Sequence, residues 1–423
     1  MREADLHITP NARRLITARE HPTWRSVRDD HRVMGVDVLL VGNYSFDHQT
    51  SMRLFAQMLE SGLRERGLQV ALTIPPAVLF PKTNRNDGFW KWVGYLNKFV
   101  FFPPVLWWRA RHANIVHICD HSNAIYVRSL ARVPHIVTCH DVIAIRAALT
   151  TKGAWRVRWS GRILQRIIMS GLARARRIVC VSALTSEQLL ELLPELAHRV
   201  EVIPNGLNFP FRQLPALQAR LLLEEIGADD TQFFLHVGSG HVRKNRAQVV
   251  RIFARLLELD LALQQNLIFV GGAPNEDIRD LIVQLKLSGR VRMLSAVNDE
   301  QLCALYSVAT GLIYPSILEG FGWPVIEAQA CGCPVFCSDL RPMTDIAKDS
   351  AIFFNPSDVD AAALKILDAL KDTKQLVEAG FANAEKFSCQ AMVDAYLHAY
   401  ECLLNPVDGA GATVSSVHAH RRT

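Results

Sequence analysis

The stretch 310–339 constrains the fold of this chain more than any other part of the sequence. It begins with an apolar run, Gly311–Tyr314, which predicts a short buried strand. Pro324 suits the first turn of a helix, because its fixed φ angle fits there, and Gly332 suits the end of that helix. Residues 334–337 predict the next strand. The stretch therefore predicts a strand–loop–helix–strand unit.

Two carboxylates, Glu319 and Glu327, bracket the loop of this unit, with seven residues between them. Glu319 is expected at the carboxyl end of a parallel strand, where open α/β sheets bind ligands. Glu327 is expected one turn into the helix, where its two oxygens could accept both hydroxyls of a ribose. The N–H groups of residues 320–323 and the positive helix end favour a sugar hydroxyl edge or a phosphate. The alternative is a surface loop followed by a solvated glutamate.

A second loop predicts an anion site. The expected strand 233–237 leads into Gly238, Ser239 and Gly240, and then into Arg243 and Lys244 just before a long helix. Backbone N–H groups and two fixed cations together form a cradle for phosphate. The spacing and the residues after the lysine differ from those of a P-loop. The alternative, an exposed Arg-Lys pair at a helix start, is disfavoured by the helix dipole.

The whole chain predicts an α/β protein. It has 423 residues, 49% hydrophobic and 21% charged, which suits about two soluble domains. Apolar runs alternate with helical patterns in both halves, so we expect two doubly wound parallel sheets facing across a cleft. Other expected strands are residues 36–41, 68–73, 114–119, 135–139, 178–182, 201–203, 267–271, 291–294 and 351–354. Residues 185–187 carry a helix-start signal.

The stretch 310–339 resembles the E-x7-E signature of retaining nucleotide-sugar glycosyltransferases with the GT-B fold, specifically glycosyltransferase family 4. The resemblance covers residues 36–404 and is strongest in the C-terminal half. It implies two Rossmann-like domains, with Glu319 at the donor sugar and Glu327 at the nucleotide ribose. It also implies donor contacts from the loop residues Gly320, Phe321 and Gly322.

The same resemblance assigns roles in the other loops. His140, at the end of the string IVTCHD, matches a histidine beside the donor sugar, although a lone histidine is more often structural. His121 has the same topological position with weaker support. Lys244 matches the lysine that neutralises the leaving diphosphate. Ser239 stands where many relatives have arginine, so Arg243 is expected to supply part of that charge.

The predicted domain organisation follows the same resemblance. We expect a weakly ordered lead-in, an N-terminal acceptor domain, a linker, a C-terminal nucleotide-sugar domain, a helix crossing back and a disordered tail. These parts are residues 1–33, 34–206, 207–231, 232–388, 389–405 and 406–423, in that order. The loop 43–49 lacks the glycine pair that the family often has in this position. A nucleobase is expected to pack near residues 296–297.

Two segments are both basic and apolar. Residues 89–111 contain four tryptophans with Lys91, Lys98, Arg109 and Arg111. They predict either two core-covering helices broken at Pro103-Pro104, or a patch that rests on an anionic membrane surface. Residues 155–176 predict an arginine-rich helix, which is more often a solvated face than a membrane contact.

Net charge and cysteine content restrict the possible binding partners and the cellular compartment. The net charge of +6 suits anionic partners such as nucleotide diphosphates or an anionic membrane, and no motif points to nucleic acid. The nine cysteines are scattered, which predicts reduced thiols in a cytoplasmic protein without a metal site. We expect no signal peptide and no membrane span, and therefore a cytoplasmic enzyme that rests at most peripherally on the inner face of a membrane.

The sequence thus predicts a retaining, metal-independent hexosyltransferase that uses a nucleotide diphosphate sugar and needs no cofactor. Its acceptor would be a saccharide or a lipid-linked molecule in polysaccharide or glycoconjugate synthesis. The string EGFGWP favours a mannosyl donor slightly. Two alternatives remain open: an epimerase or phosphorylase of the same fold, or a catalytically silent sugar-nucleotide sensor.

Overall fold

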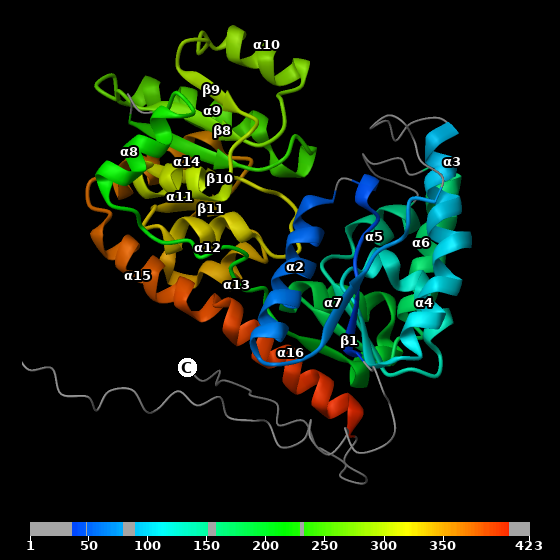
Figure 1. Ribbon diagram of the computed structural model, residues 1–423. Helices are drawn as coiled ribbons and strands as arrows, with labels where there is room; N and C mark the ends of the chain where they lie inside the picture. Colours follow the sequence, from blue (N-terminus) through cyan, green and yellow to red (C-terminus); the bar gives the residue numbers. More distant parts are fainter. Residues whose placement is uncertain (1–35, 48, 79–88, 151–157, 229–231, 406–423) are drawn as a thin grey trace, which may run out of the picture.

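The computed structural model describes residues 36–47, 49–78, 89–150, 158–228 and 232–405. The predicted lead-in 1–33 and tail 406–423 lie outside these ranges, as does residue 48 of the first loop. The described chain forms two six-stranded sheets, each purely parallel, with helices on both faces. Figure 1 shows them as separate layered units that lie next to each other. This is the predicted α/β architecture of two Rossmann-like domains.

The first sheet has the strand order β2-β1-β3-β4-β5-β6. Its inner strands are mostly buried, as expected where helices cover both faces, whereas the edge strand β6 is partly exposed. They are β1 (Val36–Val41), β2 (Val70–Thr73), β3 (Ala113–Ile118), β4 (His135–Cys139), β5 (Arg177–Cys180) and β6 (Val200–Val202). The helices are η2 (Ser45–Asp47), α2 (Thr50–Glu65), α3 (Phe89–Leu96), η3 (Asn97–Phe101), α4 (Phe102–Ala110), η4 (His121–Leu130), α5 (Ile143–Leu149), α6 (Trp159–Leu172), α7 (Ala183–Leu192) and η5 (Pro194–Arg199).

The second sheet has the order β12-β11-β10-β7-β8-β9. Its strands are β7 (Phe233–Val237), β8 (Asn266–Val270), β9 (Val291–Leu294), β10 (Gly311–Tyr314), β11 (Val335–Ser338) and β12 (Ile352–Phe354). Around them lie α8 (Ala216–Glu224), η6 (Val242–Lys244), α9 (Arg246–Leu259), α10 (Glu276–Gln284), α11 (Asp299–Val308), α12 (Trp323–Ala330), α13 (Met343–Ala347), η7 (Lys348–Ser350), α14 (Val359–Ala369), α15 (Lys374–Ala384) and η8 (Glu385–Phe387). The chain then ends its described part in α16 (Cys389–Leu404).

Two helix predictions were wrong. The expected break at Pro103-Pro104 does not occur, because these prolines lie in the first turn of α4, where a helix needs no N–H donors. The irregularity lies before them, in the π-helical turn η3. The helix expected to start at residue 185 begins at Ala183 instead. Ser182 is its N-cap, and its hydroxyl accepts from the Thr185 N–H.

Helix α16 packs on the N-terminal sheet, so the last described helix joins the first unit (Figure 1). Its apolar face, with Val393 and Tyr396, is buried against Phe55 of α2. A buried polar chain crosses the same contact: His117 of β3 lies 2.6 Å from the Tyr400 hydroxyl and 2.7 Å from Thr138 Oγ1. Burial lowers the pKa of His117 to about 3, so this imidazole is neutral.

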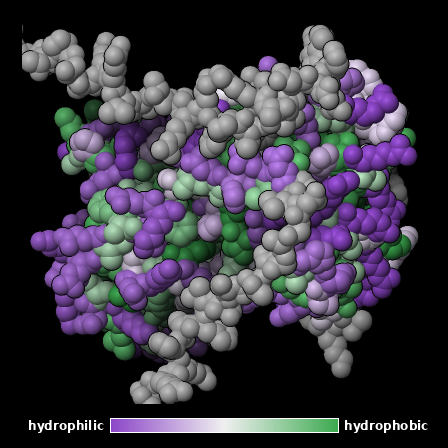
Figure 2. Space-filling view, turned by 90° about the horizontal axis from the view of Figure 1, so that it is seen from below, coloured by the Kyte–Doolittle hydropathy of each residue, from purple (hydrophilic) through white to green (hydrophobic). Residues whose placement is uncertain are grey.

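No helix within the described ranges is long and apolar enough to cross a membrane. Seen from below the view of Figure 1, the surface mixes hydrophilic and hydrophobic residues (Figure 2). The predicted domain boundaries themselves stay predictions. The strands of the first sheet come from residues 36–202 and those of the second from 233–354.

The crossing of α16 depends on a close backbone approach at Gly206. A Cβ on Gly206 would lie 2.7 Å from Cys389 Cα and 2.8 Å from the Ser388 carbonyl oxygen. Gly206→Ala should therefore lower the free energy of unfolding by about 1–3 kcal/mol, because backbone atoms cannot move aside cheaply. Urea denaturation measures this. Gly289→Ala is the matched control, since nothing lies within 4 Å of its Cβ position. Equal stabilities of the two variants would contradict the packing described.

Candidate active site

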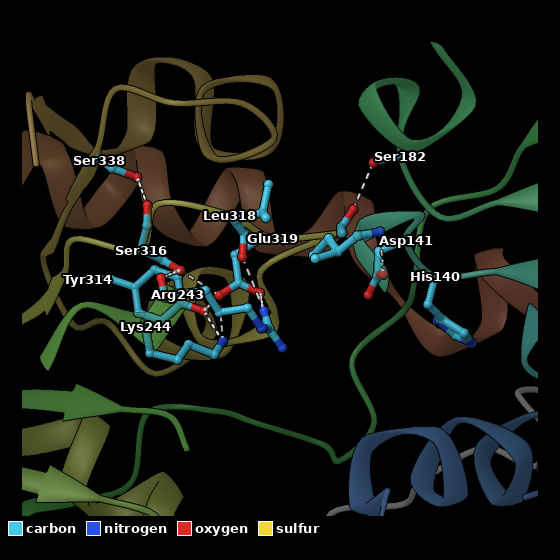
Figure 3. Close-up of polar contacts among 12 residues, drawn as sticks. His140, Asp141, Ser182, Arg243, Lys244, Tyr314, Ser316, Leu318, Glu319 and Ser338 are labelled. Atoms are coloured by element: carbon cyan, nitrogen blue, oxygen red, sulfur yellow. Dashed lines mark hydrogen bonds and ion pairs between the residues drawn. The ribbon is translucent and has the colours of Figure 1, made fainter. Parts of the chain in front are cut away.

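The site is built on the loop that leaves β10 and enters α12. Glu319 lies in this loop and is only 7% exposed. Its Oε1 accepts hydrogen bonds from Ser316 Oγ at 2.6 Å and from the Tyr314 hydroxyl at 3.0 Å. Figure 3 shows these side chains converging on the carboxylate. The sequence places both donors within five residues of Glu319, so the local turn itself holds the carboxylate in place.

Two cations from the other loop meet the same carboxylate (Figure 3). Lys244 Nζ lies 2.6 Å from Glu319 Oε1, and Arg243 Nη1 lies 2.6 Å from Oε2. Lys244 also donates to the Tyr314 hydroxyl at 2.6 Å. The structure therefore brings together three residues that the sequence predicted separately. We call Glu319, Arg243 and Lys244 the ionic cluster.

Electrostatics keep the ionic cluster charged. Burial alone would raise the pKa of Glu319, but Lys244 and Arg243 reverse this and hold it below its ordinary value. Burial lowers the pKa of Lys244, and the Glu319 carboxylate opposes that shift. The Arg243 pKa is raised, since the attraction of Glu319 outweighs the effect of its burial. The cluster thus carries one carboxylate against two cations and has a net positive charge.

A positive cluster at this position can bind an anion. Arg243 keeps 27% of its side chain exposed, whereas Lys244 keeps 11%. The cluster lies where β7 and β10, neighbours in the sheet, reach their carboxyl ends. Parallel sheets bind ligands at this edge. Diphosphate oxygens would find guanidinium and ammonium donors here together.

Glu327 lies in α12 and is also buried, at 6% exposed. The Tyr306 hydroxyl of α11 donates to its Oε2 at 3.0 Å. Burial raises the pKa of Glu327 to about 7; Tyr306 opposes this shift and the charge of Asp299 adds to it. Glu327 therefore changes charge near neutral pH, and its ionised form would gain from two hydroxyl donors.

His140 is placed differently from the ionic cluster. It follows β4, is 6% exposed, and its Nε2 lies 2.9 Å from the Cys119 carbonyl oxygen. That contact assigns the proton to Nε2, which leaves Nδ1 as an acceptor. Burial lowers the pKa of His140, so the ring is neutral. Its edge packs on Phe55, and Figure 3 shows the ring apart from Glu319. His121 forms a close pair with Asp120 at 3.2 Å instead.

The remaining predicted donor residues differ in which of their atoms a ligand could reach. Phe321 packs its side chain with Val181, Ile326 and Ile346, so only its backbone is left for a ligand. Gly322 has a φ of 112°, which favours glycine at the start of α12. Ser239 is exposed in the loop after β7.

The two sheets meet at Gly320. Its carbonyl accepts a hydrogen bond from Ser182 Oγ at 2.7 Å, and Thr185 Oγ1 lies 3.3 Å away. Ser182 follows β5 of the first sheet, so the residue next to Glu319 is held by the opposite half of the molecule (Figure 3). Ser182, Tyr306 and Tyr314 were not predicted from the sequence as residues of the site. Ser182 and Tyr306 are far from their partners in the sequence, so only the folded structure shows these contacts. Of the three residues, only Tyr314 is close enough to its partner, five residues before Glu319, for the sequence to have suggested the contact.

The described residues include no group of three or more His, Cys, Asp or Glu side chains placed to hold a metal ion. The ionic cluster can supply the positive charge that a leaving diphosphate requires. This fold and this site define the class of the protein: a GT-B protein with a positive, buried cluster at the strand ends of its second sheet.

Family comparisons identify the chain further. Residues 54–209 match the family described as Glycosyltransferase Family 4, and residues 223–386 match Glycosyl transferases group 1. The chain therefore carries a Glycosyltransferase Family 4 domain followed by a Glycosyl transferases group 1 domain. Its ionic cluster and Glu327 lie within the group 1 part.

Three curated relatives show the range of similarity. O-antigen chain mannosyltransferase B of Escherichia coli is 27% identical over 67% of this chain and 76% of its own length. D-inositol 3-phosphate glycosyltransferase of Nocardia farcinica is 28% identical, over 67% of this chain and 65% of its own. O-antigen chain mannosyltransferase RfbU of Salmonella typhimurium is 27% identical, over 49% and 55%. The chain thus matches between about half and three quarters of the length of these relatives.

Solved structures share the fold. Sucrose-phosphate synthase from Thermosynechococcus elongatus has a TM-score of 0.68 at 21% identity, covering 87% of this chain and 99% of the other. Anabaena HepE in complex with UDP and glucose has a TM-score of 0.66 at 14% identity, covering 86% and 99%. These likenesses confirm the predicted GT-B architecture.

The contact at Gly320 is open to a direct test. A Cβ on Gly320 would overlap the His140 carbonyl oxygen. Gly320→Ala should therefore push the Glu319 loop away from the first sheet and lower transferase activity about 100-fold, as small misplacements of catalytic groups can. Activity and the melting temperature are measured together. Gly272→Ala is the control, because its Cβ position is open. Parental activity in Gly320→Ala would show that this contact does not position Glu319.

Proposed function

We propose that the protein transfers a hexose from a nucleotide diphosphate sugar to a saccharide or lipid-linked acceptor, with retention of anomeric configuration and without a metal ion. The observation that carries the proposal is the ionic cluster, in which Arg243 and Lys244 meet Glu319 at the strand ends. It supports a diphosphate leaving group next to a carboxylate that steadies the sugar. The named activities of the family relatives support polysaccharide or glycoconjugate synthesis.

The proposed reaction needs charge stabilisation more than covalent catalysis. The bond between the anomeric carbon and the diphosphate oxygen breaks, and negative charge grows on the diphosphate. Lys244 and Arg243 would stabilise that charge in a site shielded from water. The acceptor hydroxyl then forms the new bond on the face that the diphosphate leaves, and its proton passes to the departing phosphate oxygen. His140 Nδ1 would accept a hydrogen bond from a sugar hydroxyl, because the imidazole ring is neutral.

The donor is proposed to carry mannose. Several relatives are named mannosyltransferases, while HepE was solved with UDP and glucose. A panel of GDP-, UDP- and ADP-sugars in a thermal-shift assay tests the proposal. A donor at about 100 times its Kd should stabilise the protein by roughly 2.7 kcal/mol. A rise in melting temperature with GDP-mannose and with no other nucleotide sugar supports the proposal. No rise with any nucleotide sugar would overturn it.

Metal independence and location remain part of the proposal. Metal independence is supported if sugar transfer continues at the untreated rate after EDTA treatment. It is overturned if EDTA abolishes transfer and added Mg²⁺ or Mn²⁺ restores it. We propose a cytoplasmic enzyme, with its acceptor in solution or at the inner face of a membrane.

Lys244 should act on turnover. Because the charge on the diphosphate grows in the transition state, Lys244→Ala should lower kcat by roughly 100-fold or more while donor KM changes much less. Steady-state kinetics measure both. Lys371→Ala, an exposed lysine paired with Asp368, is the control and should behave as the parent. A kcat within a few fold of the parental value would remove Lys244 from the phosphate site.

Glu327 should act on donor affinity and make it depend on pH. Its pKa of about 7 in the free protein means that the carboxyl is mostly protonated below that pH. Since ribose hydroxyls donate to the ionised form, donor affinity should rise between about pH 6 and 8 and then level off. Glu327→Gln should remove this dependence and raise KM by the equivalent of about 1–3 kcal/mol, with kcat little changed.

Isothermal titration with the donor over this pH range gives the measurement. Glu276→Gln, at an exposed position of α10, is the control and should keep the parental pH profile. A collapse of kcat in Glu327→Gln with unchanged KM would contradict the ribose assignment.

A further inference from the structure

Two helices of the first unit expose large apolar side chains. Helices α4 and α6 both pack on η4: Phe102 stacks edge-on against Tyr126, and Ile168 and Leu172 join the same core. Their opposite faces are uncovered within the described structure. We call the exposed residues there the α4–α6 face: Phe101, Val105 and Trp108 of η3 and α4, and Trp159, Ile163 and Ile167 of α6. Figure 1 places both helices at the side of the molecule away from the second sheet.

The spacing of these residues is helical. Trp159, Ile163 and Ile167 recur every four residues and form one stripe along α6. Trp159 is 74% exposed and Ile163 is 46% exposed, although such side chains are usually buried. On α4, Trp108 is 57% exposed. Clustered exposure of this kind marks an interaction surface.

The charge of the same segments selects the partner. Residues 88–119 and 142–186 contain thirteen lysines and arginines and no aspartate or glutamate. The whole chain has 47 basic and 41 acidic residues, so its excess of positive charge lies entirely in these two segments. Arg158 and Arg166 are exposed on or next to α6, and no carboxylate of the described residues pairs with either. Three of the thirteen, Lys98, Arg146 and Arg177, pair with carboxylates elsewhere in the first unit. The unpaired arginines beside the apolar stripe of α6 suit a partner that is both apolar and anionic.

We propose that the α4–α6 face docks on the surface of an anionic lipid bilayer. Tryptophan and isoleucine would enter the boundary between headgroups and acyl chains, while the arginines contact lipid phosphates. Arg111, whose guanidinium lies 4.0 Å from the Trp107 ring centre, adds a further cation at the edge. For residues 155–176 a solvated basic face was the favoured prediction and a membrane contact the alternative. The exposed apolar stripe on α6 changes that interpretation. The inference does not depend on which sugar is transferred.

Co-sedimentation with vesicles tests the proposal on the full chain. The parent should bind phosphatidylglycerol–phosphatidylcholine vesicles at low salt, bind pure phosphatidylcholine much less, and dissociate as salt is added. Trp159→Ser with Ile163→Ser should weaken binding by about tenfold or more. Arg158→Gln with Arg166→Gln should weaken it by about fivefold per charge. The control is Leu217→Ser with Leu221→Ser, an equally exposed apolar pair on α8 of the second unit.

Each outcome decides the proposal. Selective loss of vesicle binding in the two α6 variants, with the α8 control unchanged, supports it. No binding of the parent at low salt, equal binding to neutral and anionic vesicles, or equal binding of all variants overturns it. If the parent does not bind vesicles but forms a dimer, and the variant with Trp159→Ser and Ile163→Ser is a monomer, the face binds a second copy of the chain instead. Donor hydrolysis, measured in parallel, reports the proposed function separately, since these residues lie outside the active site.

Discussion

The site depends on the ion pairs that the buried carboxylate of Glu319 makes with Lys244 and Arg243. Lys244 is buried and Arg243 is partly buried, and holding them here without a counter-charge would cost several kcal/mol. Their position therefore depends on Glu319, which accepts from both. Tyr314 and Ser316 in turn fix the carboxylate. The cluster keeps one positive charge in excess. It is therefore assembled in the free protein and ready for an anion, with little reorganisation left for the moment of reaction.

The position of that carboxylate depends on both halves of the molecule. The next residue, Gly320, touches the backbone of His140 and accepts from Ser182, both in the first unit. Helix α16 ties the end of the second unit to α2. Any movement of one sheet relative to the other would shift Glu319 with its cations. The ionic cluster on the second sheet, where we propose that the donor binds, is thus mechanically linked to the first sheet, which the family resemblance assigns to the acceptor.

Much of the fold could be predicted from local sequence. Strands β4, β7, β9 and β10 begin and end at the predicted residues, because each is a short apolar run bounded by polar, glycine or proline residues. The error at Pro103-Pro104 came from treating proline as a helix breaker where it begins a helix. Contacts between residues distant in the sequence could not be predicted from local sequence patterns. Ser182 and Gly320 are 138 positions apart, so only the folded chain shows their hydrogen bond.

The central claim is that Glu319 balances two cations which a diphosphate then engages. Calorimetric melting of Glu319→Gln, with and without GDP or UDP, tests it most directly. Without ligand, the variant leaves the buried Lys244 and the partly buried Arg243 without their carboxylate. It should lose about 3 kcal/mol of stability, the lower end of the range for breaking a buried ion pair, because Arg243 is 27% exposed. Nucleoside diphosphate supplies the missing anion, so it should raise the melting temperature of the variant more than that of the parent. An unchanged melting temperature without ligand, or a smaller response to diphosphate than in the parent, would contradict this account.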